Sequence, residues 1–171
     1  MKKIVVTLAF LMAFLMVNNA SAQTKIKLAH INSTELMKIM PGVDTAQVAI
    51  ESYAAQLESE MKTMYAEYEK KAADFQDKQA TMSQSLQQVK LKELQELETR
   101  IKNFDSSAQE ELQAKQEELL TPIINKAKAA IAEVAKENGY TYVFDSAVGA
   151  LLYQEESDNI FELVKKKLNI K

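Results

Sequence analysis

Residues 44–75 read DTAQVAIESYAAQLESEMKTMYAEYEKKAADF, and this stretch decides the fold. It lies within a longer segment, bounded by Gly42 and Gly139, that contains no other glycine and one proline, Pro122. Glu, Lys, Gln, Ala, Leu and Met dominate the segment, and these residues have the best intrinsic helix propensity. The sequence therefore predicts that residues 43–138 are helical.

Apolar residues recur at steps of three and four along both halves of this segment, as in a coiled-coil seam. The first series is Ala46, Ile50, Tyr53, Leu57, Met61, Met64, Tyr68, Ala72 and Phe75. The second is Leu91, Leu94, Leu97, Ile101, Phe104, Ala108, Leu112, Leu119 and Ile123. A single helix would be about 140 Å long. Because the pattern lapses near residues 81–87, we expect a hairpin with its tip there, in which the two seams bury each other.

The N-terminal flank predicts a strand and a short helix. Lys25–Ile31 alternates as strands do. Asn32 and Glu35 have the spacing of a capping box, and Pro41-Gly42 should end the short helix. We expect Asp44, with Gln47 at the same spacing, to start the long helical region.

The C-terminal flank is also β-rich. Asn138-Gly139 is a helix stop, and an alanine-rich stretch before it favours close packing of the helical part on its base. Tyr140–Phe144 and Ala150–Tyr153 predict two strands, and Ser157 or Asp158 should cap a last helix ending at Leu168.

These strands are too few and too short to be stable alone. We therefore expect residues 23–42 and 139–171 to form a small β platform that is completed by association into a homo-oligomer. The fold class is mainly α, with a long coiled-coil hairpin on a short-stranded base. The candidates for the oligomer contact are apolar residues of the predicted strands: Ile26, Leu28, Ile31, Val143, Leu151 and Tyr153.

The first 22 residues have the pattern of a signal peptide. Two lysines precede an apolar run from Ile4 to Val17, and Ala20-Ser21-Ala22 suits a signal peptidase. The run is shorter than the ~20 residues that span a bilayer. We expect cleavage after Ala22, export, and no stable membrane anchor.

Composition excludes several classes of chemistry. The chain has no cysteine and a formal net charge of −3, which argues against disulfides, thiol catalysis and nucleic-acid binding. The one histidine, His30, lies in a predicted strand, and we interpret it as structural. Adjacent carboxylates such as Glu110-Glu111 point in different directions on a helix. We therefore expect no catalytic, cofactor-binding or metal site.

Methionine and tyrosine side chains on the hairpin suggest a different role. Methionine is flexible and polarizable, and it suits surfaces that meet many apolar partners. The candidate contact residues for such partners are Met61, Met64, Tyr65, Tyr68 and Met82. Filling of the seam is the alternative role for the same residues.

The order of these elements resembles the Skp/OmpH family of periplasmic chaperones. The N-terminal KIKLAHINSTELM (residues 25–37) and the C-terminal YTYVFDSAVGALLYQEESDNIFELVKKKL (residues 140–168) carry the resemblance. It implies a homotrimer in which strands of three chains form a central β-barrel and three hairpins enclose a cavity.

The resemblance further implies an ATP-independent holdase that binds unfolded outer-membrane proteins and prevents their aggregation. Known members are strongly basic whereas this chain is acidic, so binding to anionic lipid or lipopolysaccharide is poorly supported. The alternative function is a structural or adaptor coiled coil of the cell envelope.

Overall fold

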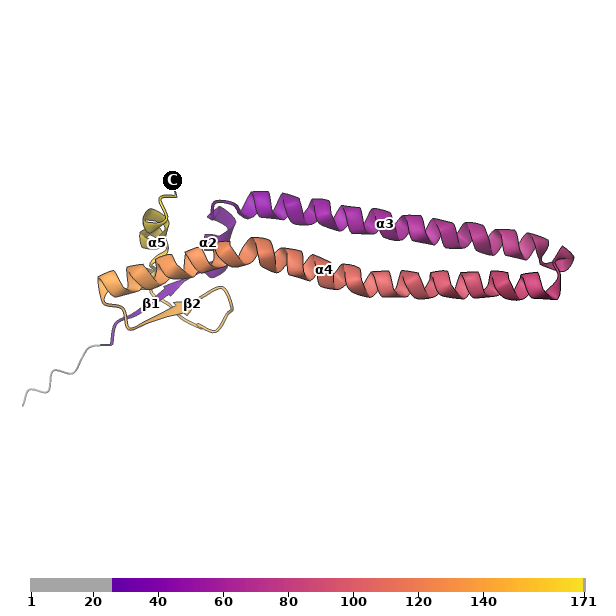
Figure 1. Ribbon diagram of the computed structural model, residues 1–171. Helices are drawn as coiled ribbons and strands as arrows, with labels where there is room; N and C mark the ends of the chain where they lie inside the picture. The colour runs from indigo at the N-terminus through magenta and orange to yellow at the C-terminus, as the bar shows by residue number, and fades with distance from the viewer. Residues whose placement is uncertain (1–25, 171) are drawn as a thin grey trace, which may run out of the picture.

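The computed structural model describes residues 26–170, so the predicted signal peptide lies outside the described residues. Two long antiparallel helices, α3 and α4, project from a small base at one end of the molecule (Figure 1). The base holds a two-stranded sheet and two short helices, α2 (Ser33–Ile39) and α5 (Phe161–Lys167). We call the paired part of α3 and α4 the arm. The predicted mainly α fold with a long helical hairpin is confirmed.

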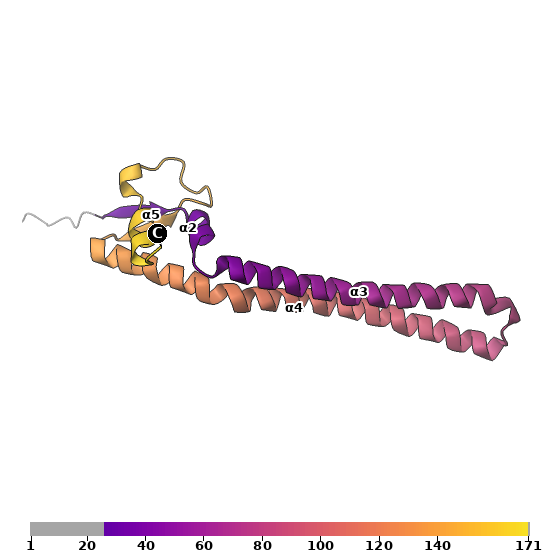
Figure 2. The ribbon, with the colours of Figure 1, turned by 90° about the horizontal axis from the view of Figure 1, so that it is seen from above.

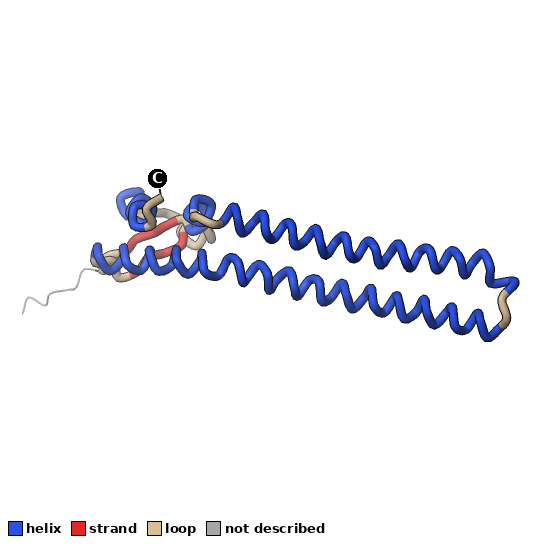
Figure 3. The backbone as a smooth tube through the Cα atoms, turned by 45° about the horizontal axis from the view of Figure 1, so that its top comes forward, coloured by secondary structure: helices blue, strands red, loops and turns tan. Residues whose placement is uncertain are grey.

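The helical hairpin consists of α3 (Val43–Lys78), a single 3₁₀ turn (Gln79–Thr81) and α4 (Gln84–Asn138). Figure 3 shows the short loop that joins the two helices at the far end. Ser83 caps α4, since its hydroxyl accepts a hydrogen bond from the Leu86 N–H at 3.3 Å. The reversal therefore occupies residues 79–83 and overlaps the start of the expected tip.

The seam of the arm follows the predicted spacing. Of the residues in the two predicted series, only Leu91 is exposed, at 45%, and all others are buried or partly buried. The most buried residues of the arm are Ala46, Ile50, Leu57, Leu97 and Ile101. Two helices bury only this one stripe, so both broad faces of the arm stay open to solvent.

The start of α3 differs from the prediction. Gly42 adopts a left-handed conformation with φ +95°, and the helix begins at Val43 without a side-chain cap. The expected capping box of Asp44 and Gln47 does not form, because the helix already begins before Asp44, and Gln47 Nε2 donates to Glu51 Oε1 at 2.9 Å. Asp44 lies within the first turn, where its charge favours the positive end of the helix dipole.

The predicted end of α4 is confirmed. Gly139 has φ +70°, and the Tyr140 N–H donates to the Ala135 carbonyl at 2.9 Å, which is the hydrogen bond of a Schellman motif. The helix continues past Pro122, which lies well inside it.

The sheet pairs the two flanks of the chain. Strands β1 (Leu28–Ile31) and β2 (Tyr142–Asp145) run parallel, with Leu28 opposite Tyr142 and Ile31 opposite Asp145. Both are shorter than predicted. The prediction of a strand at Ala150–Tyr153 was wrong for the single chain, because these residues find no neighbouring strand among residues 26–170.

The core of the molecule lies where α4 crosses the base. Ala127, Ala130 and Val134 on α4 pack against residues from β1, α2 and α5, which confirms the predicted role of the alanine-rich end. The remaining buried members of this cluster are Ala29, Ile31, Leu36, Met40, Ile160 and Val164.

The start of α5 also differs from the prediction. Ser157 and Asp158 belong to a separate 3₁₀ turn (Glu156–Asp158), and neither caps α5. Asn159 Oδ1 instead accepts from the Phe161 N–H at 3.0 Å. The next residue, Ile160, must reach the core, where it is fully buried, and this fixes the helix start two or three residues later than expected.

Helix α5 lies against the end of α4 (Figures 1 and 2). Its Lys167 Nζ lies 2.6 Å from Glu137 Oε1 and 3.0 Å from Glu133 Oε2. The hydrogen bonds to Glu137 and then Glu133 raise the pKa of Lys167. These contacts hold the C-terminal helix on the base.

Candidate functional site

The sheet of the base has one packed face and one open face. Because side chains alternate along a strand, Ala29, Ile31 and Val143 face the core beneath α4. On the other face, Leu28 is 45% exposed, Tyr142 58% and Phe144 43%. Three large apolar side chains on one uncovered sheet face mark a contact surface.

A groove of 310 Å³ adjoins this open face. Its lining residues are Leu28, Ala29, His30, Phe144, Leu151, Tyr153, Gln154, Glu155 and Asp158. Leu152, next to the groove in sequence, is fully exposed, and Tyr153 is 79% exposed. The segment from residue 150 to residue 153 therefore presents apolar side chains to solvent beside a groove of mixed apolar and polar lining.

His30 forms part of the groove floor. Only 4% of the residue is exposed, and its Nε2 lies 2.9 Å from the Glu155 carbonyl oxygen. The Ile160 N–H donates to the His30 carbonyl at 3.0 Å, so the same residue also holds the start of α5. The interpretation of His30 as a structural histidine is confirmed.

Asp145 joins the end of β2 to the start of α2. Its carboxylate accepts from the Ser33 N–H at 3.1 Å, the Ser33 hydroxyl and the Ala147 N–H at 2.9 Å. Partial burial by itself would raise the pKa of Asp145, but the hydrogen bonds from Ser33 and Ala147 together lower it. The ionised carboxylate is thus the form that orders this corner of the base.

The structure separates the six candidate oligomer contacts into two groups. Ile31 is buried and Val143 partly buried in the core of the single chain. The others are exposed or line the groove: Ile26, Leu28, Leu151 and Tyr153. The exposed Tyr142, Phe144 and Leu152 were not among the candidates. The alternation of aromatic residues in Tyr140–Phe144 was the signal that would have indicated Tyr142 and Phe144.

The arm has two faces of different chemistry, one on each side of the seam. On the first, a groove of 370 Å³ lies between Tyr65 and Tyr68 on α3 and Lys102 and Asp105 on α4. A second groove, of 600 Å³, continues toward the base along Gln109, Gln113, Gln116, Leu120 and Ile124. Since these α4 residues follow Asp105 at steps of three and four, they form one stripe of the helix. We call this side the glutamine face.

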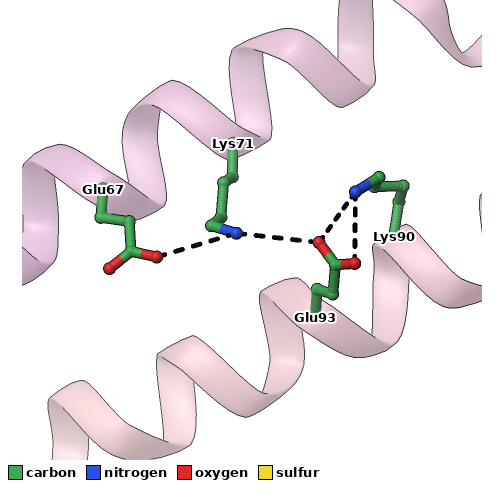
Figure 4. Close-up of polar contacts among 4 residues, drawn as sticks. All are labelled: Glu67, Lys71, Lys90 and Glu93. Carbon is green, nitrogen blue, oxygen red and sulfur yellow. Dashed lines mark hydrogen bonds and ion pairs between the residues drawn. The ribbon is translucent and has the colours of Figure 1, made fainter.

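On the opposite side, which we call the ion-pair face, charged residues connect the two helices (Figure 4). Lys71 Nζ on α3 lies 3.7 Å from both Glu67 Oε1 and Glu93 Oε2, and Lys90 Nζ lies 3.0 Å from Glu93. The hydrogen bond from Lys90 is the largest of the effects that lower the pKa of Glu93. A groove of 510 Å³ on this side includes Met64, Arg100 and Asn103.

The predicted contact residues of the arm do not share one surface. Tyr65 is 50% exposed and, with the partly buried Tyr68, lines the glutamine face. Met64 lines the ion-pair face. Met61 and Met82 are partly buried, at the seam and at the tip. Tyr65 is therefore the only one of the five with a largely free side chain.

Two further properties concern the described part of the chain. Within residues 26–170, no three His, Cys, Asp or Glu side chains are grouped so that they could hold a metal ion. No helix in the same range combines the length and apolar character needed to cross a bilayer.

A long two-faced helical arm on a small base with an open apolar sheet face defines a helical-hairpin protein. The model of a family described as outer membrane protein (OmpH-like) matches residues 27–168. The chain belongs to this family, which comprises periplasmic, non-enzymatic chaperones of the Skp type that bind outer-membrane proteins. No curated protein matches the chain.

Comparison with solved structures supports the same fold. The chain is similar to a crystal structure from Caulobacter crescentus that is described as a candidate OmpH-like outer membrane chaperone. The TM-score is 0.70 over 84% of each chain, at 14% sequence identity. At this identity the likeness concerns the fold.

Proposed function

We propose that this protein is an ATP-independent holdase that binds unfolded outer-membrane proteins in the periplasm and prevents their aggregation. The observation that carries the proposal is the match to the OmpH-like family over residues 27–168, in a chain whose arm leaves both broad faces open. A holdase acts by binding the unfolded state, and it needs no nucleotide site for this.

The shape of the arm suits such a role. Helix α4 runs from Gln84 to Asn138. A helix of that length extends about 80 Å. The two helices bury only a narrow seam, and large apolar side chains such as Tyr65 and Leu86 remain exposed. A long surface with scattered apolar groups offers many weak contacts, which an unfolded chain can occupy in many ways.

The functional form is proposed to be a homotrimer assembled through the base. A two-stranded sheet is marginal in water. The outer edge of β2 has no partner strand within residues 26–170, and residues 150–153 are without strand pairing in the same range. Addition of this segment to the β2 edge of a neighbouring copy would give both the segment and the edge a strand partner. It would also cover Leu152, Tyr153 and Phe144. Three copies related in this way would close into a small barrel.

The proposed mature chain begins at Gln23, after removal of the signal peptide, and it is periplasmic. Tyr65, Tyr68 and the three methionines, Met61, Met64 and Met82, are the proposed client contacts. Because these methionines are partly buried, their replacement would also loosen the arm. Tyr65→Gln is therefore the cleaner test of a client contact.

The function is tested by aggregation of a client. A urea-unfolded outer-membrane protein is diluted into buffer with and without the mature chain at threefold molar excess of protomers, and light scattering is followed. We expect the scattering to fall strongly without added ATP. Unchanged scattering would refute the holdase and leave the structural coiled coil as the better function.

The assembly is tested separately by mass. Static light scattering across a dilution series should give three times the protomer mass. We expect Leu152→Glu with Tyr153→Glu to yield monomers, because two carboxylates would be buried in the contact, close to Glu155 and Asp158 of the groove. Val48→Glu with Val89→Glu, on the arm, introduces the same two charges at exposed apolar sites and should leave the mass unchanged. A trimeric double variant would place the contact elsewhere.

A further inference from the structure

We infer that the part of the glutamine face nearest the base is a docking groove for extended segments of unfolded polypeptide in which apolar or aromatic side chains alternate with lysine or arginine. The inference rests on the proposed holdase function and names the surface and the client chemistry. The groove measures 600 Å³. Its lining residues all lie on α4: Gln109, Leu112, Gln113, Gln116, Glu117, Leu120, Thr121 and Ile124.

The length and the hydrogen-bonding groups of the groove match those of an extended peptide. From Gln109 to Ile124 the helix rises about 22 Å, which matches roughly seven residues of extended chain. Leu112, Leu120 and Ile124 offer three apolar contacts along such a segment. An extended segment also brings unpaired N–H and C=O groups, and each glutamine amide can both donate and accept hydrogen bonds.

The half of the arm that holds the groove carries a surplus of negative charge, and Glu117 lines the groove itself. Because Tyr53 Oη donates to Glu111 at 2.7 Å and Lys71 pairs with Glu93, residues 43–61 lie beside residues 103–121. This half of the arm contains one basic residue, Lys115. Its exposed acidic residues are Asp44, Glu51, Glu58, Glu60, Asp105, Glu110, Glu111, Glu117 and Glu118.

The outer half of the arm, residues 62–102, is nearly neutral, with eight basic and seven acidic residues. There the ion-pair face satisfies its own charges through contacts such as Lys71 with Glu93. A client would have to break these contacts in order to bind. The half near the base has a surplus of carboxylates and an apolar stripe, so cationic side chains flanking apolar ones complement it.

Binding of labelled peptides to the full mature protein tests the charge preference. An eight-residue peptide alternating Leu or Tyr with Lys is compared with the same peptide carrying Glu in place of Lys, by fluorescence anisotropy. We expect the Lys peptide to bind about tenfold more tightly at low salt. The difference should shrink near 1 M salt, where the Debye length is about 3 Å. Equal affinity for the two peptides at low salt would overturn the charge preference.

A pair of matched double variants tests the groove. Leu120→Gln with Ile124→Gln should weaken Lys-peptide binding about tenfold, because two partly exposed apolar contacts are lost. Val48→Gln with Val89→Gln changes two exposed apolar residues that line neither groove of the glutamine face, so affinity should stay within about twofold. Equal losses in both variants would exclude this groove.

Crosslinking provides a test that needs no destabilising change. The chain has no cysteine, so a single introduced cysteine is its only thiol. A photoreactive label on Gln116→Cys should crosslink an unfolded outer-membrane protein, whereas the same label on Lys70→Cys, beside Lys71 and Glu93 on the ion-pair face, should do so far less. Equal crosslinking from both sites would refute the docking face. If the unsubstituted protein fails to suppress aggregation, the holdase function itself is wrong, which is a separate outcome.

Discussion

The base and the arm are stabilised in different ways. In the base, β1 pairs with residues more than a hundred positions away, and Leu36, Ile160 and Val164 are almost completely buried. In the arm, each turn of one helix contacts only the neighbouring turns of the same helix and of its partner helix. Even the buried Leu97 and Ile101 lie in a seam that is a single stripe wide. The base is thus a three-dimensional core, whereas the arm is a nearly one-dimensional structure.

This difference separates assembly from binding. A core loses much stability when one side chain is truncated, because its neighbours cannot close the cavity. A seam of two helices can open locally without affecting distant levels, since stability varies along such a structure. The base can therefore hold the chain in one arrangement while the arm adjusts to different clients. Four changes test this contrast, from the largest expected effect to the smallest.

Ile160→Ala should destabilise the base by about 3 kcal/mol, because a fully buried side chain is truncated between β1 and α5. Urea unfolding followed by tyrosine fluorescence measures the loss. Leu163→Ala is the control, because Leu163 is an exposed residue of α5 and its truncation should change stability much less. A loss below about 1 kcal/mol would mean that the base can relax around the cavity, and the contrast with the arm would fail.

Leu97→Ala should cost about 2 kcal/mol, but locally, because Leu97 is buried in the seam. Hydrogen exchange should accelerate in the turns of α3 and α4 next to Leu97 and stay unchanged in residues 127–168. Leu91→Ala, at an exposed site of the same helix, serves as the control. Faster exchange throughout the base would show that arm and base unfold together.

Asp145→Asn should destabilise the corner between β2 and α2 by about 1 kcal/mol, because the amide keeps the shape but loses charge-assisted hydrogen bonds. The pKa of Asp145 is lowered in the folded state. Its contribution is therefore fully present above the ordinary aspartate pKa and is lost as the pH falls through the lowered value.

Thermal melts of the unsubstituted protein and of Asp145→Asn should accordingly converge in acid. Asp158→Asn, an exposed site beside the groove, is the matched control at neutral pH. A constant difference between Asp145→Asn and the unsubstituted protein down to the most acidic pH would show that the charge of Asp145 is not what stabilises the corner.

Lys71→Gln should have the smallest effect. The side chains of Lys71 and Glu93 are both substantially exposed. Exposed pairs of this kind are screened by solvent and salt. We expect a melting temperature within the error of the measurement, with Lys62→Gln as a control elsewhere on the arm. A clear loss at physiological salt would mean that the ion-pair face, and not only the apolar seam, holds the helices together.

Much of the arm could be predicted because helix formation depends on local sequence. The three- and four-residue spacing correctly indicated which side chains meet at the seam. In the base, the predicted cap of α2 is confirmed for the same reason, since Asn32 Oδ1 accepts from the Glu35 N–H at 3.0 Å. Gly139 also ends α4 as expected, because few other residues adopt its positive φ at low cost.

The predictions that failed depend on distant partners. The start of α5 differs from the prediction because Ile160 is needed in the core. Helix α3 begins at Val43, after the left-handed Gly42, although Asp44 looked locally suitable as its cap. The strand at Ala150–Tyr153 has the right composition, but a strand requires a neighbour, and residues 26–170 supply none. The same composition leaves this segment as a contact surface.

The sequence by itself determined the helical hairpin, its seam and the helix stop at Gly139, because helix propensity, side-chain spacing and glycine conformation act over a few residues. Only the tertiary structure decided the rest. The parallel pairing of β1 with β2, the open face with Tyr142 and Phe144, and the division of the arm into a glutamine face and an ion-pair face all depend on which distant segments meet. Such contacts follow from burial in three dimensions, which no local pattern records.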